Sequence, residues 1–154
     1  MGYTHYLYRA PKLESAAFAR FRDEAATLLT ALDAELRAEG SGGLAGWDGK
    51  GRPEISEERV AFNGVAPEDY ESCVIERERE RTPTDRAEDD DIDFSFTKTA
   101  YRPYDRAVIA VYAIAADHFG EQASLSSDGD DEAIDAGIAT AERILGRRLT
   151  GVRR

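Results

Sequence analysis

One long stretch of helical periodicity constrains the fold of this chain more than any other feature. Between Leu13 and Arg37 the apolar side chains recur at steps of three and four residues, and the glycine-rich segment 40–43 follows. This spacing predicts one amphipathic helix that ends at the glycines. A helix with a single apolar stripe must bury it against another layer, so the rest of the chain has to supply that layer.

Two further segments show helical periodicity. Residues 106–119 are apolar on most sides and follow Asp105, a candidate N-cap. Residues 132–145 carry one apolar stripe and follow Asp130 and Asp131, either of which can cap a helix. We expect the first of these two helices to be the most buried in the molecule.

Short segments rich in β-favouring residues separate the helices. They span residues 2–9, 60–65, 72–75, 93–100 and 123–127, whereas residues 40–56 lack a period and predict a loop or a loose hairpin. The order β-α-β-β-β-α-β-α predicts a single α+β domain, residues 1–154, in which three helices pack on a mixed sheet of about five strands.

Side-chain alternation assigns faces to two of these strands. In the first strand Tyr3, His5 and Leu7 share one face. In the segment 93–100, Phe94 and Phe96 share a face with Lys98, and we expect the two phenylalanines to mark the core side. A lysine on that side needs a partner or an opening to a cleft.

A run of alternating glutamate and arginine begins at Glu76 and passes into an acidic stretch that ends at Asp91. Either the repeat extends a strand, with glutamates on one face and arginines on the other, or it is a solvated tether. We expect residues 82–91 to be the most mobile part of the chain.

The charge of the chain disfavours two classes of partner. Thirty-one acidic and 20 basic residues give a net charge of −11, which repels nucleic-acid backbones and anionic membrane surfaces. The lone cysteine, Cys73, forms no intramolecular disulfide and suits a reducing cytoplasm. Because no long apolar stretch or secretion signal is present, we expect a cytoplasmic protein that does not span a membrane.

Arginine strongly outnumbers lysine among the basic residues. Three lysines, Lys12, Lys50 and Lys98, stand beside seventeen arginines. Together with the acidity, this bias is typical of a halophilic or high-GC source. The scarcity of lysine draws attention to Lys98.

The segment 94–105 is the strongest candidate for a binding site, because it joins the end of a strand to the start of a helix. The free amides of a helix N-terminus attract anions, and Lys98 and Arg102 add full charges there. The structural alternative is that Lys98 extends its ammonium to water or pairs with a carboxylate.

Other polar and aromatic side chains are candidates for the same kind of site. His5 can act as a general base, tyrosines can stack on a planar ligand, and the serines at 126–127 can hold a phosphate or a ribose hydroxyl. Each has a structural alternative, namely core packing for the tyrosines, helix capping for the serines, and turn formation for Asn63. The candidate ligand-binding residues are Tyr3, His5, Tyr6, Asn63, Lys98, Thr99, Arg102, Tyr104, Ser126, Ser127 and Asp128.

The sequence lacks the motifs of several familiar enzyme classes. The chain has no dinucleotide-binding fingerprint, P-loop, zinc-protease motif or nucleophile elbow. The acidic cluster at 128–132 lacks the full pattern of a calcium loop. We expect no metal and no cofactor, and we expect His118, near the end of its helix, to interact with the last carbonyls.

Four motifs together resemble a group of small phage, prophage and prokaryotic proteins without an established activity. They are MGYTHYxYR at 1–9, FNG at 62–64, FxKTAxRPYD at 96–105 and SSDG at 126–129, and the resemblance covers nearly the whole chain. It implies that His5, Asn63, Lys98, Thr99, Tyr104 and Asp128 form one site, that residues 76–91 are an insertion, and that the source is a virus or mobile element.

Three functions remain open. The first is binding of a small anionic, nucleotide-like ligand through stacked tyrosines and the two cations. The second is an enzyme acting on such a ligand, with His5 as base and Asp128 orienting it. The third is an acidic module that binds a host protein. Neither the ligand's identity nor the oligomeric state follows from the residues.

Overall fold

A computed structural model of the chain describes residues 3–79 and 93–154. The elements follow the order β1 (Thr4–Arg9), α1 (Ser15–Ala38), β2 (Leu44–Ala45), β3 (Glu54–Ile55), β4 (Arg59–Gly64), β5 (Cys73–Glu76), β6 (Asp93–Lys98), α2 (Asp105–Phe119), the 3₁₀ turn η2 (Gly120–Gln122), β7 (Ala123–Ser127) and α3 (Asp130–Leu145). The predicted α+β class with three helices is confirmed. The segment 40–56, predicted as a loop or loose hairpin, contributes the two-residue strands β2 and β3.

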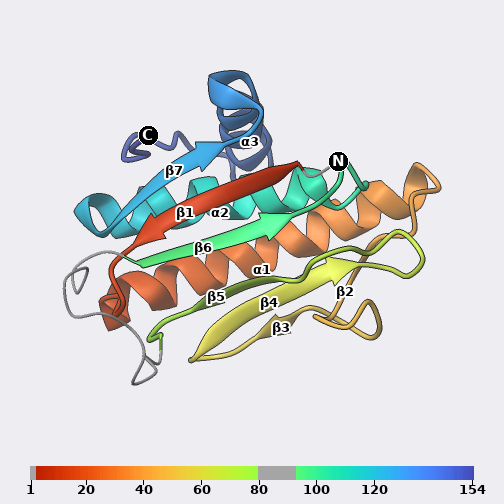
Figure 1. Ribbon diagram of the computed structural model, residues 1–154, viewed down its shortest axis with the longest axis horizontal. Coiled ribbons are helices and arrows are strands. Elements are labelled where there is room, and N and C mark those ends of the chain that lie inside the picture. Colours follow the sequence, from red (N-terminus) through yellow and green to blue (C-terminus); the bar gives the residue numbers. More distant parts are fainter. Residues whose placement is uncertain (1–2, 80–92) are drawn as a thin grey trace.

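The named strands form two antiparallel ladders that lie side by side in one curved layer (Figure 1). In one ladder β1 is central and pairs with β6 and β7, so that Leu7 lies opposite both Ser95 and Leu125. In the other, β4 pairs with β2, β3 and β5. No register joins β5 to β6, although these strands face each other, so the layer is divided between them.

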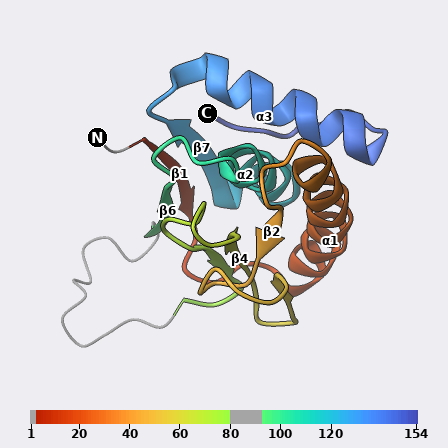
Figure 2. The same cartoon turned by 90° about the vertical axis from the view of Figure 1, so that its right-hand side faces the viewer.

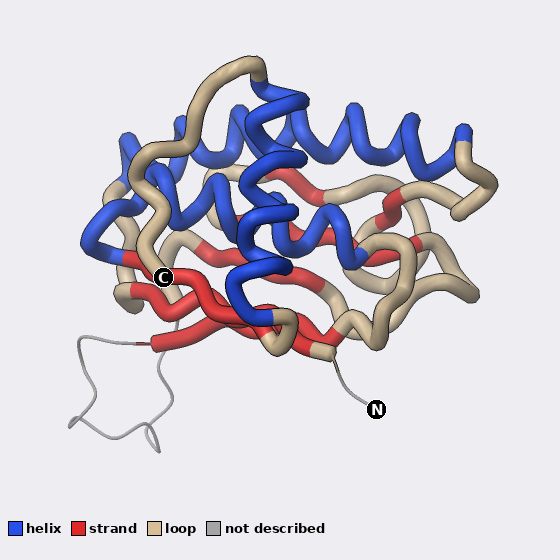
Figure 3. Tube along the Cα trace, turned by 90° about the horizontal axis from the view of Figure 1, so that it is seen from above, coloured by secondary structure: helices blue, strands red, loops and turns tan. Residues whose placement is uncertain are grey.

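All three helices cover the same face of the strand layer (Figures 2 and 3). Helix α2 lies between the other two, and most of its side chains are buried, as the sequence predicts. No helix of residues 3–79 and 93–154 lies on the opposite face of the β6-β1-β7 ladder. Which side chains point to which face therefore decides what this ladder presents to solvent.

Helix α1 has both a continuous apolar stripe and a side-chain cap at its first turn. Glu14 accepts a hydrogen bond from the Ala17 N–H at 3.0 Å and so satisfies one free amide of the first turn. Phe21 packs on Phe119 of α2, with ring centroids 5.4 Å apart, and both rings are buried. Each such burial stabilises the fold by about 1.5–3 kcal/mol.

Helix α3 approaches α2 closely at Gly137. A Cβ at this position would lie 2.7 Å from Ile109 Cγ1 and 2.9 Å from the Ile109 carbonyl oxygen, so only glycine fits. The predicted caps of this helix are wrong, because Gly129 occupies the N-cap position and no side chain caps it. Asp130 and Asp131 lie in the first turn, where their charge favours the helix dipole.

The predicted core side of β6 is wrong. Phe94 and Phe96 are 45% and 51% exposed, whereas Thr97 and Thr99 are buried. The physical reason lies in α2, because the Tyr112 hydroxyl is buried beneath the strand and needs a polar partner, which the Thr97 hydroxyl provides at 2.9 Å.

The expected role of His118 is also wrong. Its Nε2 lies 2.6 Å from Glu24 Oε1 on α1, rather than at the carbonyls of its own helix. Arg147 contacts the same carboxylate at 2.5 Å and Asp117 at 2.9 Å. This network joins α1, α2 and the segment after α3.

Part of the alternating Glu/Arg segment is described. Glu76 is the last residue of β5, and Glu78 makes an isolated bridge to Lys12. The strand therefore does not continue through the repeat as far as it is described. The predicted mobility of residues 82–91 concerns residues outside the described part of the chain.

Candidate functional site

A buried histidine links three separate elements at one end of the β6-β1-β7 ladder. The His5 side chain on β1 is 0% exposed. Its Nε2 lies 2.7 Å from Asp105 Oδ1 at the start of α2, and its Nδ1 lies 2.8 Å from Ser127 Oγ at the end of β7. The register of the strands explains the second contact, because His5 and Ser127 are directly opposite each other.

The donors and acceptors of this cluster form a consistent chain. An ionised Asp105 only accepts, so Nε2 donates to it and Nδ1 of a neutral ring accepts from the Ser127 hydroxyl. Thr99 donates a second hydrogen bond to the same carboxylate oxygen. Ser127 Oγ in turn accepts from the Gly129 N–H at 3.0 Å. Every polar group of the cluster therefore has a partner.

Asp128 attaches the turn before α3 to the first strand. Its carboxylate accepts from the Thr4 N–H at 3.0 Å and from the Tyr6 hydroxyl at 3.3 Å. Its own N–H donates to the Thr4 carbonyl oxygen at 2.9 Å. The residue is exposed, so its carboxylate keeps acceptor sites that face solvent.

Two tyrosines stack beside the histidine. The rings of Tyr3 and Tyr101 are parallel within 20° at a centroid distance of 4.1 Å, and the rings of Tyr3 and His5 are nearly perpendicular, at 82°, with centroids 5.1 Å apart. Burial and the nearby Asp105 charge raise the pKa of Tyr3, so it remains a neutral phenol. A Cβ on Gly129 would lie 2.1 Å from the Tyr3 hydroxyl oxygen, far too close, which explains the glycine at position 129.

The loop that carries Tyr101 has an unusual backbone. Ala100 and Tyr101 have φ angles of +50° and +62°, a left-handed conformation that costs free energy in residues with a Cβ. Hydrogen bonds from the Thr99 N–H to the Tyr3 carbonyl oxygen and from the Arg102 N–H to the Thr99 carbonyl oxygen hold the loop. Tyr101 nevertheless remains 70% exposed, so one side of its ring is available.

Lys98 and Arg102 are the cations next to this loop. Lys98 shares the outer face of β6 with the exposed phenylalanines, is half-buried, and has no ion pair within the described residues. Arg102 is more exposed and lies 3.6 Å from Glu68. Within the described residues, neither Lys98 nor Arg102 forms a close, buried ion pair.

The predicted anion site at the start of α2 is not free. The Asp105 N–H donates to the Arg102 carbonyl oxygen, and the Ala107 N–H to the Tyr104 carbonyl oxygen, both at 2.9 Å. Asp105 is also not the N-cap that the sequence predicts, because Tyr104 holds that position and caps nothing with its side chain. The Asp105 carboxylate instead binds His5.

Two predicted site residues, Asn63 and Tyr104, are used as scaffold, and a third, Ser126, lies beside Tyr6 without a side-chain hydrogen bond within the described residues. The side-chain amide of Asn63 is bonded to backbone groups. Its Nδ2 donates to the Tyr70 carbonyl oxygen, and its Oδ1 accepts from the Tyr70 N–H. Tyr104 is buried and donates to the Glu71 carbonyl oxygen at 2.6 Å, and burial raises the pKa of its phenol. Ser126 lies on the outer face of β7, opposite Tyr6. Asn63 and Tyr104 thus act as scaffold for the segment 64–72.

The structure brings together His5, Thr99, Ser127, Asp128, Tyr3 and Tyr6, with Lys98 and Arg102 at the margin. It adds Asp105 as the histidine's partner and Tyr101 as the exposed ring. Sequence alone does not assign Asp105 to this site, because an aspartate before a helix is explained equally well as a cap.

No family model matches this chain, and no curated protein or solved structure is significantly similar to it. Within residues 3–79 and 93–154, no group of three or more His, Cys, Asp or Glu side chains is arranged to hold a metal ion. In the same part of the chain, no helix combines the length and the apolar character needed to cross a bilayer.

Proposed function

We propose that this protein binds a small planar ligand with an anionic group, such as a nucleotide, at the loop that presents Tyr101. The observation that supports this most is the Tyr101 ring, which is 70% exposed yet held by left-handed backbone and by stacking on Tyr3. Strained residues persist where the surrounding structure holds them, and they are concentrated at functional sites.

The surroundings of the ring suit such a ligand. A base would stack on the free side of Tyr101, which contributes about 1–3 kcal/mol per base in known single-strand binders. Lys98 and Arg102 would meet the anionic group, and the exposed Asp128 carboxylate would accept hydrogen bonds from hydroxyl groups. The buried His5 cluster would keep the first strand, the loop and the turn before α3 in register.

Titration calorimetry with a panel of nucleotides and cyclic dinucleotides tests this proposal. Binding that Tyr101→Ala and Lys98→Ala each weaken by about tenfold or more is expected. Trp47→Ala is the matched control for an exposed aromatic ring, since Trp47 is 61% exposed, and Lys50→Ala is the control for the lost charge. A panel without any binding, or equal losses in the controls, would refute the proposal.

One observation favours a second candidate, catalysis on the same ligand. Ser127, His5 and Asp105 form a hydroxyl, imidazole and carboxylate chain like that of serine hydrolases, although with the two ring nitrogens exchanged. His5 is 0% and Ser127 is 7% exposed, so of these two residues only the serine has a surface that a substrate would contact. Asp128, expected to orient the histidine, instead binds Thr4 and Tyr6.

Mass spectrometry separates the two candidates. A bound nucleotide that is recovered unchanged after long incubation supports binding alone. Turnover that Ser127→Ala abolishes, while calorimetry still detects binding, would support catalysis.

A further inference from the structure

The division between β5 and β6 leaves two strand edges facing each other. The Thr99 N–H bonds to the Tyr3 carbonyl oxygen, and the Arg77 N–H to the Glu58 carbonyl oxygen. Because hydrogen-bonded pairs alternate along antiparallel ladders, the backbone groups of Phe96 and Val74 must point away from β1 and β4. They point into the space between β5 and β6.

Side chains and backbone close this space at both ends. At one end the Glu71 N–H donates to the Lys98 carbonyl oxygen, and the Lys98 N–H donates to the Glu71 carboxylate. At the other end Arg79 Nη1 donates to the Phe94 carbonyl oxygen at 2.6 Å. Between them lies a pocket of about 210 Å³, too small for an added strand.

Arg9 reaches this pocket from β1. The residue is 2% exposed, and no carboxylate of the described residues lies within ion-pair distance of it. Its Nε donates to the Ala10 carbonyl oxygen, and its Nη2 donates to the carbonyl oxygens of Pro11 and Arg77, at 3.2–3.5 Å. Of its five N–H groups, the two on Nη1 therefore have no acceptor in the described part.

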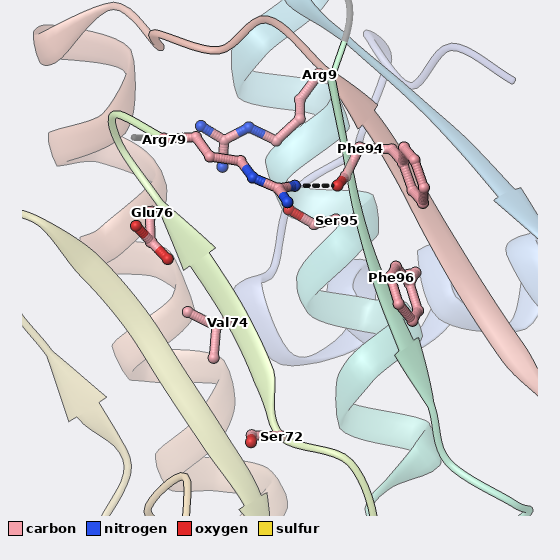
Figure 4. A pocket seen from close by; sticks show the side chains of 8 residues that line it. All are labelled: Arg9, Ser72, Val74, Glu76, Arg79, Phe94, Ser95 and Phe96. Atoms are coloured by element: carbon pink, nitrogen blue, oxygen red, sulfur yellow. Dashed lines mark hydrogen bonds between the residues drawn. The ribbon is translucent and has the colours of Figure 1, made fainter. Parts of the chain in front are cut away.

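The unused N–H groups on Nη1 are accessible to solvent. Within the described residues, no side-chain nitrogen that is fully buried lacks a hydrogen-bond partner, so Nη1 is reached by solvent. Arg9 lines this pocket and also a second cavity beside Ala10 and Ser124, and in Figure 4 its guanidinium extends into the space between β5 and β6. Burial lowers the pKa of Arg9 to about 10, with the Asp93 charge opposing the effect and Arg79 adding to it, and the group stays charged at neutral pH. A buried charge without a close counter-ion is costly.

A second guanidinium lies beside the first. In Figure 4 the guanidinium groups of Arg9 and Arg79 extend from opposite sides into the space between the two strands. Arg79 is paired with Asp93 at 3.1 Å. The hydroxyls of Ser72 and Ser95 also line the pocket, and Glu76 is the one acidic residue among its lining side chains.

We propose that this pocket binds a small oxyanion, a carboxylate or phosphate group, through Arg9 and Arg79. Two guanidinium groups offer forked donors that match such oxygens, and the Ser95 hydroxyl, beside the Arg79 guanidinium in Figure 4, and the Phe96 N–H add neutral donors. The two guanidinium groups lie toward the end of the ladder opposite to the Tyr101 loop, because His5 and Arg9 are four residues apart on one strand, about 13 Å.

Calorimetric titration with sodium phosphate and, separately, sodium acetate at one fixed ionic strength tests the proposal. Arg79→Gln is expected to weaken binding by about tenfold, since a charge-assisted pair is lost. Arg59→Gln is the matched control, because Arg59 is similarly exposed, with a side-chain exposure of 49% against 46%, and is also paired with one glutamate or aspartate. Binding of only one of the two anions supports the proposal and assigns the class of ligand.

Glu76, the single acidic residue in the pocket lining, provides a second test, in which the substitution should strengthen binding. Glu76→Gln is expected to strengthen oxyanion binding severalfold, because a like charge is removed from the lining. Glu78→Gln makes the same change in net charge two residues away, outside the lining, and is expected to leave binding unchanged. The proposal would be overturned if the unaltered protein bound neither phosphate nor acetate. Equal effects of the two substitutions within either matched pair would also overturn it.

Discussion

Thr97 on β6 and Tyr112 on α2 share a hydrogen bond of 2.9 Å between their hydroxyls, and both residues are 0% exposed. This contact joins the strand layer to the most buried helix. It also explains why small polar side chains, rather than the two phenylalanines, face the core. Burial raises the pKa of Tyr112 well above that of a free tyrosine, so the phenol stays protonated.

Loss of one partner in this pair should cost more than loss of both. Thr97→Val leaves the Tyr112 hydroxyl buried and unpaired, and the free energy of unfolding should fall by about 1–3 kcal/mol. Adding Tyr112→Phe should recover part of that loss, as a urea denaturation double-mutant cycle can measure. Strictly additive losses would contradict the contact.

Replacement of the buried histidine should destabilise the fold. His5→Ala leaves Asp105 and Ser127 without their shared partner, and we expect a loss of about 3 kcal/mol in denaturant unfolding. His118→Ala is the comparison, and a smaller loss is expected because His118 is partly exposed and Glu24 keeps Arg147. If His118→Ala proved the costlier change, the His5 cluster would not be the stronger structural link.

The close crossing of α2 and α3 should not tolerate a methyl group. Gly137→Ala places a Cβ against Ile109, and the helices can relieve the overlap only by moving apart. We expect a loss of about 1–3 kcal/mol, although alanine favours helices. Ala136→Ser, on the exposed face of the same helix, should change stability by no more than about 0.5 kcal/mol. Circular dichroism melts of both variants measure this, and a stabilised Gly137→Ala protein would contradict it.

Glu24 should make stability depend on acid pH. Hydrogen bonds from Arg147 and, secondarily, His118 lower its pKa below the ordinary value of 4.5. A carboxyl with a depressed folded pKa stabilises the fold above its unfolded pKa, and this contribution disappears as the pH falls through the folded pKa. The stability difference between wild type and Glu24→Gln should therefore be largest above about pH 5 and shrink below pH 4.5.

The control for this titration is Glu57→Gln, because Glu57 is exposed and forms no ion pair within the described residues. Its difference from wild type should stay small at every pH. A Glu24→Gln difference that did not change between pH 6 and pH 3 would refute the expected linkage.

Cys73 should be unreactive in the folded protein. The thiol is fully buried on β5, and burial raises its pKa to about 12. Because the thiolate is the reactive form, a disulfide reagent at pH 8 should label the native protein far more slowly than the denatured protein. Equal labelling rates would show that the β5 region opens readily.

Local patterns were sufficient to locate most of the elements. The helix predicted over residues 13–37 spans Ser15–Ala38, and the last strand spans the predicted Ala123–Ser127. These elements follow from the spacing of apolar residues within a few turns, and from the glycines that end them. Their existence and type were therefore determined by the sequence itself.

The tertiary structure decided which partners the elements have. Alternation shows that Phe94 and Phe96 share a face, but only the position of α2 decides that Thr97 faces the core. Asp105 is equally suited to capping and to binding His5, and the strand register that brings His5 to it is a non-local property. The unpaired edges of β5 and β6, where Arg9 and Arg79 meet, likewise arise from contacts distant in sequence, which no local pattern encodes.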